Sequence, residues 1–329
     1  MKNASLLTAA ALVAMSCAAH AGPIAPHGAT GARPQSTMGQ PREDGGQIAL
    51  WPKDLAIAPP ETDQPESVVF GHTLVAGRHY RAILNVSRPT MTIYPPKGRN
   101  SGAALMVFPG GGYQALAIDL EGSEICDWAT GLGMTCVVLK YRVPQDWHPK
   151  TCRPCDQEPH PFLPLQDAER AMGLLRQRAA SLGIDPHRIG VVGFSAGGHL
   201  VTAISNATGR NYTPVDAADR LSARPDFAMP IYPGHLWNGR GTDLHAYDPV
   251  RADAPPTFIV QAEDDPVDDV RNSISYFLAL RAVKVPVEMH IYAHGGHAFG
   301  ARPTDQPITH WTSLAGQWLR TIGMLPKAR

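Results

Sequence analysis

A serine between two glycines is the pattern in this sequence best suited to nucleophilic chemistry. It lies in Gly193-Phe194-Ser195-Ala196-Gly197, between an apolar run at Ile189 to Val192 and a helix-like run at Ala196 to Ser205. Strand, sharp turn and helix form the context of a nucleophile elbow, where backbone strain pushes the serine hydroxyl outward. The flanking glycines let the strand and helix backbones pass closely. Because such a motif also arises by chance, the chain must supply a base, an acid and an oxyanion site.

His297 is the candidate general base. It lies in Ala293-His294-Gly295-Gly296-His297-Ala298-Phe299-Gly300, directly after the last predicted strand. The chain holds 14 histidines, so position carries the argument more than residue type. Glycines before the imidazole allow the loop to reach over the sheet end toward the serine. His294 is the alternative base and is otherwise expected at the rim of the site.

The acid that orients the base is expected in an acidic turn after the strand at Thr257 to Gln261. The turn reads Glu263-Asp264-Asp265-Pro266-Val267-Asp268-Asp269, and only one of its carboxylates needs to reach the base. Asp265 is favoured because Asp-Pro-Val makes a tight turn just beyond the strand. Asp268 is the second candidate and Asp264 the third.

An oxyanion site is predicted in Pro109-Gly110-Gly111-Gly112-Tyr113, after the strand at Ala104 to Phe108. Three glycines let the backbone aim N–H groups at a developing oxyanion, together with the residue after the nucleophile. The assigned donors are the N–H groups of Gly111, Gly112 and Ala196. A phosphate-binding loop is disfavoured because no G-x-x-x-x-G-K-[ST] pattern is present.

Aromatic and histidine side chains in nearby loops are candidates for the rim of the site. Tyr113, His199 and Trp237 are the predicted substrate-binding residues, and Trp147 and His235 fall in loops at the same rim. Aromatic rings there could stack on a sugar. For His199, on the helix after the serine, a packed and hydrogen-bonded structural histidine is the alternative.

The elements that position these residues alternate between strand and helix. The predicted strands are residues 92–94, 104–108, 135–141, 188–192, 227–231, 257–261 and 287–292, and the predicted helices are residues 121–130, 165–182, 196–205, 272–283 and 308–322. Continuous apolar strands between helices predict an α/β fold with a mostly parallel sheet covered on both faces. Ligands of such sheets bind beyond the carboxyl ends of the strands, which is where Ser195 lies.

Composition narrows the classes of partner. The 329 residues are 43% hydrophobic, and 29 basic residues balance 29 acidic ones. Without a basic stripe, nucleic acid is not an expected partner and electrostatic membrane binding is not indicated. No segment suggests a stable membrane insertion, and the oligomeric state stays open.

The amino-terminal segment predicts export. Lys2 precedes an apolar run from Leu6 to Ala19, which is too short to span a membrane, and Ala19-His20-Ala21 resembles a cleavage signal. Residues 1–21 are therefore predicted to be a signal peptide, residues 22–45 a flexible lead-in, and residues 46–329 one catalytic domain. The expected location is secreted or periplasmic. A lipoprotein attached through Cys17 is the alternative.

Four cysteines remain after the predicted cleavage, namely Cys126, Cys136, Cys152 and Cys155. An even count in an exported protein suggests disulfides, and four cysteines allow three pairings. The favoured pairs are Cys126–Cys136 and Cys152–Cys155. A zinc site built from the second pair with His148 and His160 is the alternative, although a second C-x-x-C is absent.

Several stretches together resemble secreted esterases of the α/β-hydrolase superfamily, in the branch of acetyl-xylan esterases and related polysaccharide deacetylases. The stretches are Leu50 to Pro52, Pro109 to Tyr113, Glu121-Gly122, Lys140 to Pro144, Leu165 to Ala171, Gly193 to Leu200, Tyr232-Pro233 and Gly295 to Gly300. The chain departs from many relatives at Pro109, where they have histidine, and after Asp265, where they often have Val-Pro. The segment Trp147 to Pro161 looks like an insertion.

The resemblance implies a serine carboxylesterase that needs neither metal nor organic cofactor. Ser195, His297 and Asp265 would form a triad that hydrolyses short acyl esters through an acyl-enzyme. The expected substrate is an acetylated carbohydrate such as xylan, or a small ester. The alternatives are a feruloyl or general short-chain carboxylesterase and, in another class, a non-catalytic binding protein on a hydrolase scaffold. A peptidase is less favoured because no second domain is evident.

Overall fold

The computed structural model describes residues 46–60, 62–145 and 162–327. The predicted signal peptide, the lead-in, Trp147, the Cys152–Cys155 pair and its zinc alternative with His148 and His160 lie outside the described residues. Among the described residues, no helix is both long and apolar enough to cross a bilayer. The same residues contain no group of three or more His, Cys, Asp or Glu side chains arranged to hold a metal ion.

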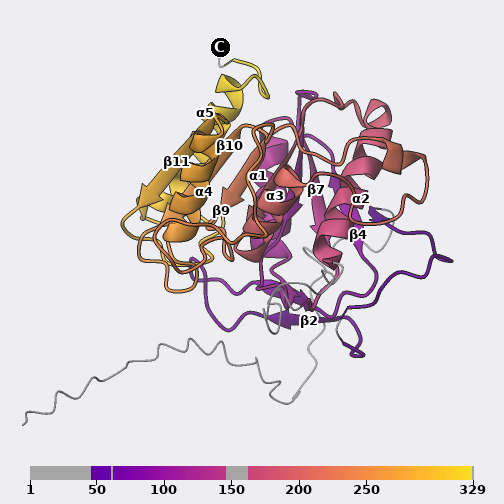
Figure 1. The fold of residues 1–329 in the computed structure, drawn as a ribbon, viewed down its shortest axis with the longest axis horizontal. Helices are drawn as coiled ribbons and strands as arrows, with labels where there is room; N and C mark the ends of the chain where they lie inside the picture. The colour runs from indigo at the N-terminus through magenta and orange to yellow at the C-terminus, as the bar shows by residue number, and fades with distance from the viewer. Residues whose placement is uncertain (1–45, 61, 146–161, 328–329) are drawn as a thin grey trace, which may run out of the picture. The chain divides into compact units, whose positions relative to one another are not determined.

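An eight-stranded sheet forms the core of the fold, in the order β1-β4-β7-β5-β8-β9-β10-β11 (Figure 1). Its strands are β1 (Gln47–Ala49), β4 (Thr90–Tyr94), β5 (Ala104–Phe108), β7 (Thr135–Lys140), β8 (Ile189–Phe194), β9 (Ala228–Ile231), β10 (Thr257–Ala262) and β11 (Val287–Tyr292). β1 and β4 pair antiparallel, and the strands from β7 to β11 run parallel. The prediction of a mostly parallel α/β sheet is confirmed.

Burial explains why the central strands are mostly apolar. Every residue of β5, β7, β8, β9 and β10 is buried, because helices cover the sheet on both faces. These helices are α1 (Glu124–Gly131), α2 (Leu163–Arg178), α3 (Ala196–Asn206), α4 (Arg271–Ala282) and α5 (Trp311–Thr321). α1 and α5 meet through Trp128 and Trp311, whose ring centroids lie 5.5 Å apart.

The structure corrects several predicted boundaries. The expected helix at residues 121–130 begins as a π-helical turn at Asp119–Ser123, and α1 follows it. α2 begins at Leu163 because Pro164 is tolerated in a first helical turn, and it gives way to a 3₁₀ turn at Ala180–Leu182. Another 3₁₀ turn, Pro307–His310, precedes α5. The sequence reading missed β1 and a three-stranded sheet of β2 (Ser67–Phe70), β3 (Arg81–Leu84) and β6 (Ala115–Leu116).

A disulfide joins Cys126 in α1 to Cys136 in β7, with Cα atoms 5.3 Å apart. This is one of the two pairs favoured from the sequence. It links α1 to the strand that follows it after the short connection at residues 132–134.

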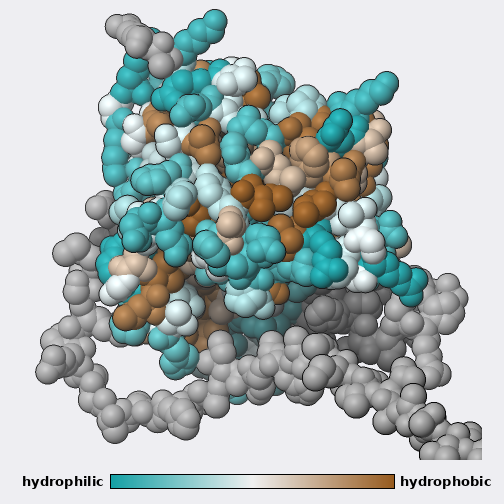
Figure 2. Space-filling model, turned by 90° about the vertical axis from the view of Figure 1, so that its left-hand side faces the viewer, coloured by the Kyte–Doolittle hydropathy of each residue, from teal (hydrophilic) through white to brown (hydrophobic). Residues whose placement is uncertain are grey.

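Figure 2 views the molecule from the β11 side of the sheet, where apolar side chains gather over part of a mostly hydrophilic face. Exposed apolar residues in the elements at this edge include Leu278 of α4 and Ile291 of β11. β11 is the last strand of the sheet, so its outer edge has no strand neighbour among the described residues.

Candidate active site

Ser195 lies at a strained turn between β8 and α3. Its φ of 52° and ψ of −119° fall in a region that non-glycine residues rarely adopt. A Cβ at Gly193 would lie 2.1 Å from the carbonyl oxygen of Gly197, and one at Gly197 would lie 2.1 Å from that of Phe108. The close approach of backbones expected at these two glycines is therefore confirmed, and the serine hydroxyl is directed out of the sheet.

His297 and Asp265 lie beside this hydroxyl. Nε2 of His297 is 3.1 Å from Oγ of Ser195, and Nδ1 is 2.8 Å from Oδ2 of Asp265. A carboxylate only accepts, so Nδ1 carries the ring proton and Nε2 is left to accept from the serine. The geometry thus connects the three residues assigned from the sequence, in the register favoured for the acid.

The acidic turn holds Asp265 by several hydrogen bonds. Oδ1 of Asp265 accepts from the backbone N–H groups of Val267 at 2.9 Å and Asp268 at 3.0 Å. The side-chain amide of Gln261, at the end of β10, donates to Oδ2 of Asp265 at 3.1 Å. With its side chain fully buried, Asp265 is an immobile partner for the imidazole.

Asp264 and His294 lie outside the chain of contacts from Ser195 to His297 and Asp265. Asp264 accepts from the backbone N–H groups of Gly295 and Gly296, at 2.9 and 2.8 Å, and its other oxygen lies 3.2 Å from Nδ1 of His294. The side chain of His294 is 82% exposed, and the imidazole that bonds to Ser195 is that of His297. Asp264 therefore anchors the loop that carries His297.

Asp268 comes closer to the nucleophile than the sequence suggested. Its Oδ2 accepts from Oγ of Ser195 at 3.1 Å and lies 3.8 Å from Nε2 of His297. Burial raises the pKa of Asp268 to about 6, with Asp265 nearby adding to the shift and His297 opposing it. The turn thus places the Asp265 carboxylate at Nδ1 of the imidazole and the Asp268 carboxylate near Nε2.

The pKa of His297 is raised above its ordinary value. Burial alone lowers it, but the hydrogen bond to Asp265 and the negative charges of Asp268, Asp265 and Glu121 raise it further than burial lowers it. The imidazolium form is consequently well stabilised, as a base that receives a proton during catalysis requires.

The glycine loop after β5 lies against the nucleophile. A Cβ on Gly110 would lie 2.5 Å from the carbonyl oxygen of Phe194 and 3.1 Å from Cβ of Ser195. Gly111 and Gly112 have φ values of 134° and 62°. Among the described residues, neither of their N–H groups has a hydrogen-bond acceptor. With Ala196 at the first turn of α3, these are the three donors assigned to the oxyanion.

Glu121 connects the loops after β5 and β9 by hydrogen bonds. It was not among the site residues predicted from the sequence. Its Oε2 accepts from the Gly110 N–H at 2.7 Å, and its Oε1 accepts from the Tyr232 hydroxyl at 2.8 Å. The Tyr232 oxygen in turn accepts from the Gly300 N–H at 3.3 Å. Burial raises the pKa of Glu121. The only sequence signal was that Glu121 and Tyr232 fall in stretches shared with the resembling family.

Two of the three residues expected to bind substrate are buried. The hydroxyl of Tyr113 lies 2.7 Å from Nδ1 of His199, and Nε2 of His199 lies 3.2 Å from Asp248. Both side chains are inaccessible to solvent, and Tyr113 has a positive φ of 58°. Their expected place at the rim does not fit this burial. For His199, the packed and hydrogen-bonded alternative fits.

Trp237 is partly exposed, in the loop after β9. The guanidinium of Arg271 lies 3.6 Å from the centroid of the Trp237 ring, and the backbone N–H of Trp237 donates to Asn272 Oδ1 at 2.9 Å. These contacts hold the ring on the first turn of α4. A contact between Trp237 and substrate stays a prediction.

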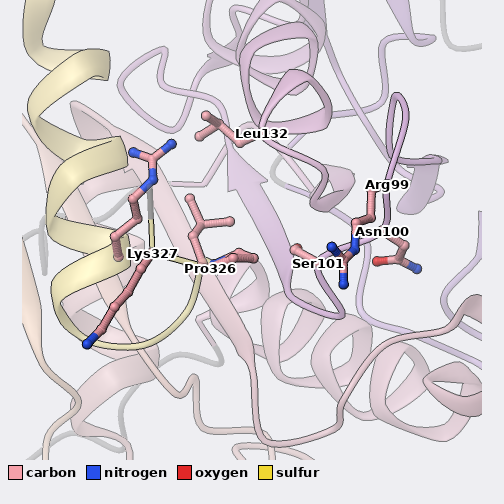
Figure 3. Close-up of a pocket in the computed structure, with 8 residues that line it drawn as sticks. Arg99, Asn100, Ser101, Leu132, Pro326 and Lys327 are labelled. Atoms are coloured by element: carbon pink, nitrogen blue, oxygen red, sulfur yellow. The ribbon is translucent and has the colours of Figure 1, made fainter. Parts of the chain in front are cut away.

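A pocket of about 270 Å³ lies at the opposite end of the sheet (Figure 3). Arg99 and Ser101 line it before β5, Leu132 before β7, and Pro326 and Lys327 after α5. This is the amino end of the parallel strands, whereas Ser195 follows the carboxyl end of β8. The pocket is therefore separate from the triad.

Comparison with known proteins agrees with this fold. Residues 166–322 match the model of the prolyl oligopeptidase family. A solved acetyl ester-xyloside bifunctional hydrolase from Caldicellulosiruptor lactoaceticus superposes with a TM-score of 0.64 and 29% identity, over 85% of this chain and 97% of that one. The chain has the α/β-hydrolase fold.

Two further relatives carry esterase names. The acetylxylan esterase of Xylanibacter ruminicola is 30% identical over 282 residues, which are 78% of this chain and 53% of the relative. The chain thus spans about half the length of that relative. Esterase 2 of Thermogutta terrifontis, solved after phosphorylation by paraoxon, superposes with a TM-score of 0.60 and 25% identity over 74% of this chain and 92% of that one.

Proposed function

We propose that this α/β hydrolase is a serine carboxylesterase that removes short acyl groups, acetyl above all, from hydroxylated substrates. The observation that carries the proposal is the continuous contact chain from Ser195 Oγ through His297 to Asp265, at 3.1 and 2.8 Å. An activated serine needs a base in hydrogen-bond reach and an acid that orients the base. Names of relatives, including acetylxylan esterase and the ethyl acetate hydrolase of Pseudomonas putida, support acetyl esters.

The mechanism follows from the positions of these groups. Ser195 attacks the ester carbonyl while its proton passes to His297 Nε2, and Asp265 stabilises the imidazolium. The N–H groups of Gly111, Gly112 and Ala196 stabilise the negative oxygen of the tetrahedral intermediate. The imidazolium then protonates the leaving alcohol. Water next attacks the acyl-enzyme and gives a proton to His297, and the carboxylic acid leaves as His297 returns that proton to Ser195. Ser195, His297 and Asp265 emerge unchanged.

Removal of the triad residues tests the proposal. Ser195→Ala and His297→Ala are expected to lose on the order of 10⁶ in kcat on 4-nitrophenyl acetate, with no further loss in the double variant. Asp265→Asn is expected to lose about 10⁴, because the amide favours the wrong ring tautomer. Ser181→Ala, which alters an exposed serine, is the control. Retained acetate release by Ser195→Ala would refute the mechanism, whereas no release by the wild type would favour a non-catalytic binding role.

The natural substrate is proposed to be an acetylated carbohydrate such as xylan. Acetate release from acetylated xylan is compared with release from acetylated pectin and chitin oligomers, and with ferulate release from feruloylated arabinoxylan. A prolyl peptide substrate is included because of the matched family. Hydrolysis of ethyl acetate without any release from the polymers would indicate the general short-chain esterase instead.

We also propose export of the chain, from the composition of residues 1–21. The disulfide between Cys126 and Cys136 supports it, since disulfides persist in oxidising compartments. Amino-terminal sequencing of the protein recovered from periplasm or medium is expected to begin near Gly22. Recovery of the uncleaved chain from the cytoplasm would contradict export.

A further inference from the structure

Asp268 is placed firmly beside the nucleophile by its own backbone. Its N–H donates to Oδ1 of Asp265 at 3.0 Å, and its carbonyl oxygen accepts from the Gln261 side chain at 3.0 Å. Gly234 lies against its other carboxylate oxygen, since a Cβ there would lie 2.4 Å from Oδ1. The side chain of Asp268 is only 13% exposed. Its contact with Ser195 is therefore a property of the folded turn.

In the described residues, the Asp268 carboxylate accepts a hydrogen bond from the Ser195 hydroxyl and from no other donor. That hydroxyl carries a single proton. When the proton turns to Nε2 of His297 for attack, Asp268 loses its donor. A desolvated carboxylate without a donor is costly, so the reactive arrangement favours a replacement donor at this position.

We propose that Asp268 binds a free hydroxyl of the substrate alcohol, on the carbon next to the esterified one. This inference rests on the proposed ester hydrolysis and narrows its substrate class to monoesters of 1,2-diols, sugars included. His297 Nε2 must reach the leaving ester oxygen, and Oδ2 of Asp268 lies 3.8 Å from Nε2. Two oxygens on adjacent carbons of one alcohol can therefore contact the two groups at once.

The charge of the group suits this task. Since burial raises the pKa of Asp268 to about 6, the carboxylate form dominates above that pH. A carboxylate accepts from a hydroxyl strongly but repels an ether oxygen, which has no proton to donate. Asp268 thereby selects substrates that carry a hydrogen-bond donor at this position, and not every polar substrate.

A matched set of acetates tests the inference. 2-Hydroxyethyl acetate and propyl acetate differ by a hydroxyl in place of a methyl group, and 2-methoxyethyl acetate keeps the oxygen but cannot donate. The measurement is the ratio of kcat/KM for the hydroxyl ester to that for propyl acetate. Because both values come from one enzyme preparation, the ratio does not depend on the folded fraction.

Replacement of Asp268 by alanine is expected to lower this ratio by roughly 10- to 100-fold, the effect of losing a hydrogen bond to a charged group. Asp268→Asn, whose amide also donates, is expected to accept 2-methoxyethyl acetate better than the wild type does. Asp269→Asn is the control. It removes the same charge from the same turn, but its carboxylate pairs with exposed Arg271, so the wild-type ratio is expected.

An unchanged ratio in Asp268→Ala, with both esters still hydrolysed, would overturn the inference and leave the proposed esterase intact. A drop of equal size in Asp269→Asn would also overturn it, because charge alone would then be responsible. If the wild type hydrolyses none of the three acetates, the proposed function fails, and the inference that rests on it fails as well.

Discussion

At the scale of the residue, the Ser195 hydroxyl has one proton and two possible acceptors, His297 and Asp268. Ser195 Oγ lies 3.1 Å from both His297 Nε2 and Asp268 Oδ2. A hydroxyl turned to Asp268 is unproductive, and one turned to His297 is ready for attack. The ionised Asp268 also stabilises the imidazolium. The protonation state of His297 is thus coupled to the acceptor that the Ser195 hydroxyl chooses, His297 or Asp268.

Neutralising Asp268 is expected to move the acid limb of the pH profile. Catalysis needs neutral His297, so kcat/KM rises as pH passes the histidine pKa. The charge of Asp268 raises that pKa, and Asp268→Asn removes the charge. The midpoint of the acid limb should therefore shift to lower pH, measured with an uncharged ester from pH 5 to 9.

The matched control for this shift is Asp269→Asn, whose carboxylate faces Arg271 and not the imidazole. Its pH profile should overlay that of the wild type. A midpoint that rises in Asp268→Asn, or that moves equally in both variants, would contradict the assigned electrostatic effect.

At the scale of the element, the site is assembled at the carboxyl ends of four parallel strands. β5 ends in the glycine loop, β8 in Ser195, β10 in the acidic turn and β11 in the histidine loop. Several residues that follow these strands and β9 have positive φ, namely Tyr113, Ser195, Tyr232 and Ala298. Sharp strand-to-loop turns at one edge of the sheet bring the functional groups together.

Gly197→Ala tests how closely these turns must pack. The new methyl group would lie 2.1 Å from the carbonyl oxygen of Phe108 and 2.8 Å from that of Pro109. Since both neighbours are backbone, we expect a loss of about 1–3 kcal/mol in the free energy of unfolding and a clear loss of kcat. Urea denaturation and an acetate assay measure the two effects.

Gly131→Ala provides the comparison, because an added Cβ there meets nothing within 4 Å. This variant is expected to keep its activity and to equal or slightly exceed the wild type in stability. If Gly197→Ala behaved like Gly131→Ala, the close approach of α3 to β5 would not limit the site.

At the scale of the whole molecule, a buried ion pair joins segments that are distant in sequence. Arg142, just after β7, donates to Asp167 of α2, and the Trp51 indole donates to the same carboxylate at 2.8 Å. Arg142 also donates to the carbonyl oxygen of Ala58 at 2.8 Å. The pair thus attaches residues 51–58 to the edge of the fold near α2.

Asp167→Ala is expected to lower the free energy of unfolding by about 3–5 kcal/mol, because it leaves the buried Arg142 charge without its partner. The Arg142 and Asp167 side chains are 1% and 0% exposed. Asp127→Ala, which breaks an ion pair between side chains 62% and 74% exposed, should cost less than about 1 kcal/mol. Equal losses in urea denaturation would contradict this account.

Much of the architecture could be predicted from local patterns. Apolar runs marked the central strands, and β5 and β11 have the predicted bounds. Strands such as β2 and β6 were missed because they have only four and two residues, too few for a period to be visible, and β2 is exposed throughout. Short edge elements depend on pairing partners that a local pattern does not contain.

The sequence by itself determined which turns carry chemistry, because motif spacing and glycine positions are local properties of the chain. Only the tertiary structure decided what each carboxylate does. Asp265 and Asp268 are three residues apart in one turn, and their different partners follow from the packing of Gln261 and Gly234 around them. Glu121 became visible only when Gly110 and Tyr232 converged on it. Such roles arise from contacts between distant segments, and the fold alone creates those contacts.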